Sequence, residues 1–217
     1  MKKYGLRTVK AALGLAICAF GTYLSIRANI GLAPWDAFSI GVSNISGVSY
    51  GTVVVVTGLI VLIADIVMKE KLGIGTLLDI AIVGKTVDFY TWLDLVPQQH
   101  SLAMGLLMMV AAQFILAFGI YIYMSAALSC GPRDALMIGI GKRLKRIPVG
   151  AVRTLMEAVV LLVGWLLGAK IGVGTVVAVV GLGMCIQIVF SAAKFDAEAV
   201  VHDGFAEMLP AARVPAE

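Results

Sequence analysis

Ionisable side chains occur inside stretches of this sequence that are otherwise apolar. Arg153 and Glu157 are four residues apart, and Lys85 and Asp88 are three apart, so each pair shares one face of a helix. With Asp79 they have the chemistry of a proton or substrate relay, because charges inside membrane spans tend to face a cavity or a partner. The alternative is two buried ion pairs that fix the register of the helices, and Arg153 could also reach the inner membrane surface through its long side chain.

The chain that carries these residues is unusually apolar. Of its 217 residues, 60% are hydrophobic and 14% are charged, whereas an average soluble domain has about 25% charged residues. Its mean hydropathy is +0.99. This composition excludes an ordinary soluble domain and a disordered chain, and it indicates an integral membrane protein.

Six stretches approach the length of about 20 apolar residues that a membrane crossing requires. They are too long and too uniformly apolar for the alternating strands of a barrel, so we expect helices. The predicted fold class is an all-α bundle of six spans. The stretches are 9–27, 51–68, 74–93, 102–128, 149–168 and 172–192.

Lysine and arginine alternate between the two sides that six crossings would define. They are concentrated at the N-terminus and in the second and fourth connections, whereas the first and fifth connections hold only Arg27 and Lys170. Positive residues favour the cytoplasmic side. We therefore predict cytoplasmic termini in a bacterial inner membrane, with the basic cluster at 142–146 and the polar tail at 193–217 on that side.

A sequence repeat divides the chain into two halves. Pro-Trp-Asp-Ala at 34–37 recurs as Pro-Arg-Asp-Ala at 132–135, 98 residues later. Lys-x-Gly-x-Gly-Thr at 71–76 recurs at 170–175, 99 residues later. The predicted units are a cytoplasmic N-terminus at 1–8, three-span repeats at 9–98 and 99–192, and the tail. Three crossings per half would invert the second half relative to the first, as in several transporter folds.

Each half contains a proline-interrupted connection after its first span. Because Asp36 is the only charge between residues 29 and 50, we expect that connection to be buried. Prolines at the first turn predict short helices over 34–43 and 132–142. Such paired interruptions indicate a midplane site whose free N–H groups suit a polar or anionic group; the alternative is surface connectors with aspartates as helix caps. The predicted substrate-binding residues are Pro34, Asp36, Pro132, Arg133 and Asp134.

Other kinds of site find little support in the sequence. The three cysteines and two histidines form no metal-binding or paired pattern. No nucleophile motif is present, so neither an enzyme, a metal site nor a cofactor is expected. Nucleic-acid binding is not expected either, because the basic residues adjoin a membrane and lack interleaved aromatics.

Several motifs resemble a known family. They are Gly-Leu-Ala-Pro-Trp-Asp-Ala-Phe at 31–38, Gly-Pro-Arg-Asp-Ala-Leu at 131–136, Arg-Thr-Leu-Met-Glu at 153–157, Gly-Trp-Leu-Leu-Gly at 164–168 and Gly-Val-Gly-Thr at 172–175. Over residues 6–192 the chain resembles the YczE/YyaS/YitT group of uncharacterised bacterial membrane proteins, specifically its YczE-like branch. The resemblance implies a multi-span plasma-membrane protein and assigns no site residue.

The function that these features favour is a small secondary transporter or carrier for a small polar or anionic solute. In this interpretation Asp79, Lys85, Asp88, Arg153 and Glu157 are coupling groups. The alternative is a non-transporting accessory or regulatory protein that binds a partner protein or lipid; a membrane enzyme ranks third. The lipid bilayer is the expected partner, and a homodimer is compatible with so small a chain, although no residue argues for one.

Overall fold

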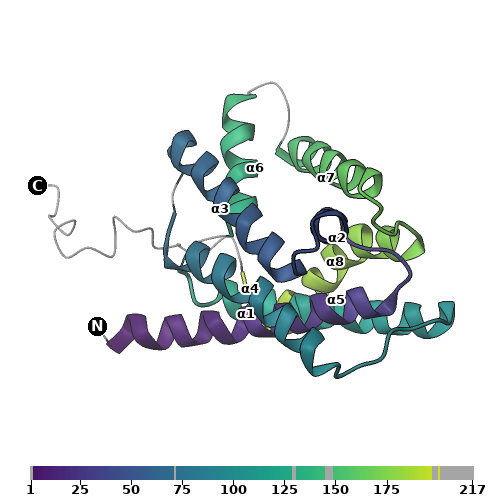
Figure 1. The fold of residues 1–217 in the computed structure, drawn as a ribbon. Coiled ribbons are helices and arrows are strands. Elements are labelled where there is room, and N and C mark those ends of the chain that lie inside the picture. Colours follow the sequence, from purple (N-terminus) through teal and green to yellow (C-terminus); the bar gives the residue numbers. More distant parts are fainter. Residues whose placement is uncertain (1, 71, 129–130, 145–148, 197–199, 201–217) are drawn as a thin grey trace, which may run out of the picture.

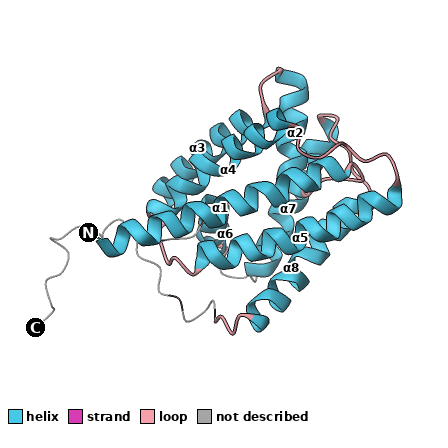
Figure 2. Ribbon diagram, turned by 90° about the horizontal axis from the view of Figure 1, so that it is seen from below, coloured by secondary structure: helices cyan, strands magenta, loops and turns pink. Residues whose placement is uncertain are grey.

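The chain is folded into α-helices joined by loops, in agreement with the predicted all-α class (Figures 1 and 2). The computed structural model describes residues 2–70, 72–128, 131–144, 149–196 and 200. Lys71, the predicted basic residues Lys145 and Arg146, and most of the tail lie outside the described residues. The helices are α1 (Lys2–Ala28), α2 (Pro34–Ser46), α3 (Tyr50–Met68), α4 (Ile74–Leu93), α5 (Leu102–Met124), α6 (Pro132–Arg143), α7 (Val149–Leu166) and α8 (Val173–Ala192).

Two short helices, α2 and α6, follow the first and fifth helices, as the prolines predicted. Pro34 and Pro132 stand in the first turns, where the missing proline N–H costs no intrahelical hydrogen bond. α2 ends at Gly47, whose φ of 70° is in the left-handed region and whose N–H donates to the Ser43 carbonyl at 2.9 Å. The sequence placed this end three residues too early, because Ser46 still belongs to the helix.

The prediction that the connection from residue 29 to residue 50 is buried was correct only for its first part. The segment from 31 to 41 is buried or half-buried, whereas residues 44–49 are exposed. α2 packs against α7, and a Cβ on Gly41 would lie only 2.8 Å from the Gly164 carbonyl oxygen. The last turn of α2 continues beyond this contact, which is why its side chains are exposed.

In the described part of the chain, four helices are long and apolar enough to cross a membrane: α1 over Gly5–Ala28, and α3, α5 and α8 over their full lengths. Their exposed surfaces carry many large apolar side chains, as a lipid-facing surface would. α4 and α7 have 20 and 18 residues and carry the intrahelical charges that the sequence singled out.

Helices α1 and α5 pack side by side over much of their lengths, along one side of the molecule in Figure 1 (Figures 1 and 2). Gly14 approaches Gly119, whereas Gly21, two turns later in α1, approaches Ala112, an earlier residue of α5. The two helices therefore run antiparallel. A Cβ on Gly119 would lie 2.7 Å from the Cys18 backbone nitrogen, so only glycine allows the helices to come this close.

Contacts between α1 and α5 occur in pairs that are related by the 98-residue offset of the repeat. A Cβ on Gly21 would lie 2.7 Å from Leu116 Cγ, and a Cβ on Gly119 would lie 2.6 Å from Cys18 Sγ. Position 21 corresponds to 119 and position 18 to 116, so one contact occurs twice with the halves exchanged. Cys18 and Leu116 also touch each other, with Sγ 3.8 Å from the Leu116 carbonyl oxygen.

The same exchange recurs where the loops meet the helices. The N–H of Gly174 donates to the Ile30 carbonyl at 2.9 Å, and the N–H of Gly75 donates to the Leu128 carbonyl at 3.0 Å. Gly75 and Gly174 begin equivalent helices, α4 and α8, whereas Ile30 and Leu128 precede the two short helices. The loop before each short helix therefore accepts a hydrogen bond from the first turn of the last helix of the opposite half, Ile30 from α8 and Leu128 from α4.

The short helices follow the same rule. α2 packs on the end of α7, where a Cβ on Gly41 would lie 2.8 Å from the Gly164 carbonyl oxygen and from Cβ of Leu167, the residue after the helix. α6 packs on α3, where a Cβ on Gly139 would lie 3.0 Å from Met68 Cε. Each short helix therefore packs on a long helix of the opposite half.

Candidate functional site

The first turns of α2 and α6 meet through an aromatic ring and a guanidinium group. Arg133 Cζ lies 4.6 Å from the centroid of the Trp35 ring, which is cation–π distance. Trp35 and Arg133 occupy equivalent positions in the two repeated motifs. The contact therefore brings together the two interrupted connections that the sequence predicted to form a site.

Three carboxylates lie around this contact. Asp36 accepts a hydrogen bond from the Tyr50 hydroxyl at 2.8 Å. Asp79 Oδ2 lies 3.2 Å from the position that a Cβ on Gly131 would take, directly before α6. Arg133 lies within electrostatic range of Asp36, Asp79 and Asp134. We call Trp35, Asp36, Tyr50, Asp79, Arg133 and Asp134 the central cluster.

The guanidinium of Arg133 is held by its face and not by its edge. Within the described part of the chain, the structure gives it no hydrogen bond and no ion pair within 4 Å; its only specific contact is the Trp35 ring. Its N–H groups are arranged in a planar fork that suits a carboxylate or phosphate. A small anion could therefore bind to this edge without breaking an existing hydrogen bond.

Arg153 and Glu157 form the predicted ion pair on α7. Arg153 Nε lies 3.0 Å from Glu157 Oε1, and the side chains are 55% and 25% exposed. Both lie within electrostatic range of Asp134. The pair thus borders the central cluster, and it is more exposed than the structural interpretation expected.

Lys85 and Asp88 serve to hold α3 against α4. Asp88 Oδ1 accepts from the Gly51 N–H at 2.7 Å, and Oδ2 accepts from the Ser49 hydroxyl at 2.7 Å. Lys85 Nζ donates to the Thr52 hydroxyl at 2.7 Å and lies 3.9 Å from Asp88. Asp88 thus accepts one of the free N–H groups at the start of α3, and both side chains bind hydroxyl groups there, so a structural role accounts for both.

Pro34 and Pro132 are buried in the first turns of their helices. Neither has a polar side chain, so they position the neighbouring residues of the central cluster. Trp35 and Tyr50 belong to the cluster although they were not predicted as site residues. The repeat gave a signal for Trp35, because it occupies the position equivalent to Arg133.

Asp65, a further charge inside an apolar stretch, lies apart from these groups. Its side chain is fully buried on α3, and neither carboxylate oxygen has a hydrogen-bond partner in the described residues. Its electrostatic neighbour is Glu70, which pairs with Lys142 at 2.5 Å. It is therefore not part of the central cluster.

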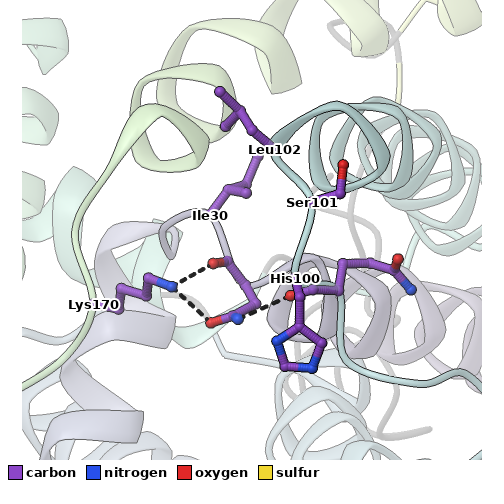
Figure 3. Close-up of a pocket in the computed structure, with 7 residues that line it drawn as sticks. Ile30, His100, Ser101, Leu102 and Lys170 are labelled. Carbon is purple, nitrogen blue, oxygen red and sulfur yellow. Dashed lines mark hydrogen bonds between the residues drawn. The ribbon is translucent and has the colours of Figure 1, made fainter.

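A hollow of about 420 Å³ opens among loops, and none of the predicted site residues lines it (Figure 3). It is lined by residues 29–30, 99–102 and Lys170. Lys170 Nζ donates to the Asn29 backbone and side-chain oxygens at 2.7 and 3.0 Å, and the Asn29 amide donates to the Gln99 carbonyl at 2.9 Å. These bonds tie the three loops together, and the charged group of the hollow is already engaged.

Comparisons with known proteins agree with a membrane-embedded helical chain. An uncharacterised membrane protein of Bacillus subtilis, YczE, is 30% identical over 80% of this chain and 80% of its own. An uncharacterised protein of Haemophilus influenzae is 29% identical over 80% of this chain and 78% of its own. YyaS of Bacillus subtilis, also uncharacterised, is 28% identical over 81% of this chain and 88% of its own. No solved structure gives a significant match.

The apolar helices and these relatives define the class of the protein, which is an integral membrane protein. A model of a family of unknown function, DUF6198, matches residues 5–191. The chain belongs to this family. The resemblance to YczE and YyaS that the motifs indicated is thereby confirmed.

Proposed function

We propose that the chain crosses the membrane six times, as two three-span halves of opposite orientation. Support comes from α1 and α5, which are equivalent in the repeat and antiparallel in space. The contacts exchanged between positions 98 or 99 residues apart fit a two-fold relation between the halves. The distribution of lysine and arginine then puts both termini in the cytoplasm of a bacterial inner membrane.

On this scaffold we propose a small secondary transporter for a small anionic solute. The observation that carries the proposal is the contact between Trp35 and Arg133, because it joins the first turns of both short helices. Short helices that meet between inverted halves are a common form of transporter binding site. Charged groups inside a span indicate function when they face one another around such a site.

The chemistry of the central cluster divides into two roles. Arg133 has an N–H edge for an anionic group, and the first turns of α2 and α6 add free backbone N–H groups nearby. Asp36, Asp79 and Asp134 surround the same guanidinium. An anion beside three carboxylates is repelled unless a proton is bound, so we propose that solute and proton move together, with Asp79 as the coupling carboxylate.

Flux into proteoliposomes tests this function. We would screen inorganic phosphate and small carboxylates, with and without an inward proton gradient. Arg133→Gln should abolish uptake, and Asp79→Asn should make residual uptake independent of the gradient. Lys69→Gln is the matched control, because it removes a positive charge from an exposed side chain that has no hydrogen bond or ion pair with the described residues, and it should leave uptake unchanged.

Uptake that is equal in Arg133→Gln and the unaltered protein would exclude the proposed site. If no solute is transported and a partner protein or lipid co-purifies at fixed stoichiometry, the accessory or regulatory role is the better account.

A further inference from the structure

The start of α3 is joined to the middle of α4 by a close glycine contact. A Cβ on Gly51 would lie 2.1 Å from the Gly84 carbonyl oxygen, so the two backbones touch. Asp88 accepts the Gly51 N–H at 2.7 Å, and Lys85 donates to Thr52 at 2.7 Å. One end of α3 is thus closed onto α4 by glycine packing and by polar contacts together.

The equivalent helices of the second half, α7 and α8, are not closed in this way. Gly150 and Gly183 stand 99 residues after Gly51 and Gly84. Among the described residues, no side chain or neighbouring backbone lies within 4 Å of a Cβ on either glycine. In the described residues α7 packs on α2 and α6, α8 packs on α5, and α7 and α8 diverge from the loop that joins them (Figure 1).

The open face of α7 does not suit lipid. It carries Gly150 and, one and two turns later, Arg153 and Glu157, with the Arg153 side chain 55% exposed. Charged side chains in spans avoid hydrocarbon and face protein or water. The first half shows which helix packs on the equivalent face. Arg153 corresponds to Val54, and Val54 Cβ lies 3.0 Å from the position that a Cβ on Gly84 of α4 would take. The equivalent partner of α7 is therefore α8.

The facing surface of α8 has matching chemistry. Gly183 offers the same absence of a side chain as Gly84, and Gln187 stands where α4 has Asp88. A glutamine carbonyl can accept a backbone N–H as the Asp88 carboxylate does, without adding a charge. The surfaces of α7 and α8 therefore resemble the two halves of the contact already formed by α3 and α4.

We propose that α7 and α8 close onto each other through Gly150 and Gly183 in a second conformation, in which the contact between α3 and α4 opens. The second half then has the closed arrangement and the first half the open one. In that conformation a solute reaches the central cluster from the opposite side of the membrane. Rocking of one inverted half against the other around a fixed site is how such folds alternate access. The proposal rests on the duplication proposed above and is independent of the solute.

Disulfide cross-linking in membranes tests the proposal without any transport assay. In a background with Cys18, Cys130 and Cys185 replaced by alanine, one protein carries Thr52→Cys with Lys85→Cys. A second carries Ala151→Cys with Met184→Cys, the pair at equivalent positions. We expect both pairs to cross-link within one chain, although the structure joins only α3 and α4 by extensive packing among the described residues and holds the first pair in contact.

A protein that carries both cysteine pairs gives a stronger test, because the two contacts should never form in the same chain at the same time. With all four cysteines present, each chain should form one cross-link or the other. Gly183→Leu should abolish only the 151–184 cross-link, because its side chain enters open space here and would block closure. An absent 151–184 cross-link beside an efficient 52–85 one would overturn the proposal, and so would a 151–184 cross-link that forms only between two chains.

Discussion

The two charged pairs that share a helical spacing have different surroundings. Asp88 accepts from a backbone N–H and from a hydroxyl group of α3, so it functions as a cap between two helices. Glu157 has Arg153 as its partner on the same helix, beside Asp134. Spacing alone predicted both pairs, but it could not distinguish a cap from a pair that borders the site, because the distinction depends on neighbouring helices.

Removal of the Asp88 carboxylate tests the capping role. Asp88→Ala leaves the Gly51 N–H without its acceptor, and an unsatisfied buried donor costs about 1–3 kcal/mol. We expect a lower midpoint of thermal unfolding in detergent. Gln187→Ala, the equivalent substitution on α8, should leave the midpoint unchanged because Gln187 is exposed. Equal unfolding midpoints for the two variants would show that the Asp88 hydrogen bonds do not stabilise the contact between α3 and α4.

The contact between Trp35 and Arg133 can be tested in the same way. Trp35→Ala removes the ring beneath the guanidinium, which is worth about 0.5–2 kcal/mol, whereas Trp35→Phe retains part of the interaction. We expect thermal stability to fall in the order unaltered, phenylalanine, alanine. Trp165→Ala provides the control, because that ring is 57% exposed. A loss of stability as large in the control would argue against a specific contact.

At the scale of elements, proline and glycine carried most of what the sequence could predict. Pro34 and Pro132 marked the starts of α2 and α6 correctly. The exposed last turn of α2 was missed, because burial there depends on where α7 ends. Asp36, Arg133 and Asp134 were predicted to lie at one site, whereas Trp35 and Tyr50 were not predicted as site residues. The position of Asp79 beside the short helices could not be predicted, because α4 reaches them through tertiary packing alone.

The crossing of α1 and α5 makes a prediction at this scale. Gly119→Ala would place a Cβ 2.7 Å from the Cys18 backbone nitrogen, which cannot move without separating the helices. Overpacking of this kind costs about 1–3 kcal/mol. We expect a lower yield of folded protein and a lower unfolding midpoint in detergent.

Gly181→Ala on α8 is the matched control for this crossing. A Cβ there meets only Val177 of the same helix at 3.7 Å, which is ordinary contact distance. A tolerated Gly119→Ala variant, with the same midpoint as the control, would mean that the helices are not held at this separation.

At the scale of the whole molecule, the account depends on two halves that face opposite sides of the membrane. The repeat offset was readable from the sequence because motifs with rare residues recur. The unequal charges were readable too, because Arg153 corresponds to the apolar Val54. The unequal packing was not, because whether α3 packs on α4, or α7 on α8, depends on tertiary contacts. A symmetric scaffold with unequal charges is the arrangement that a carrier with one polar centre requires.

The most direct test of this central claim is the labelling of single cysteines with a membrane-impermeant maleimide on intact cells. In the cysteine-free background, Asn44→Cys follows the first span, and Lys142→Cys occupies the corresponding region of the second half. Two inverted halves predict that position 44 is labelled from outside, whereas position 142 is labelled only after the cells are opened. Labelling of both positions from the same side would contradict the inverted arrangement.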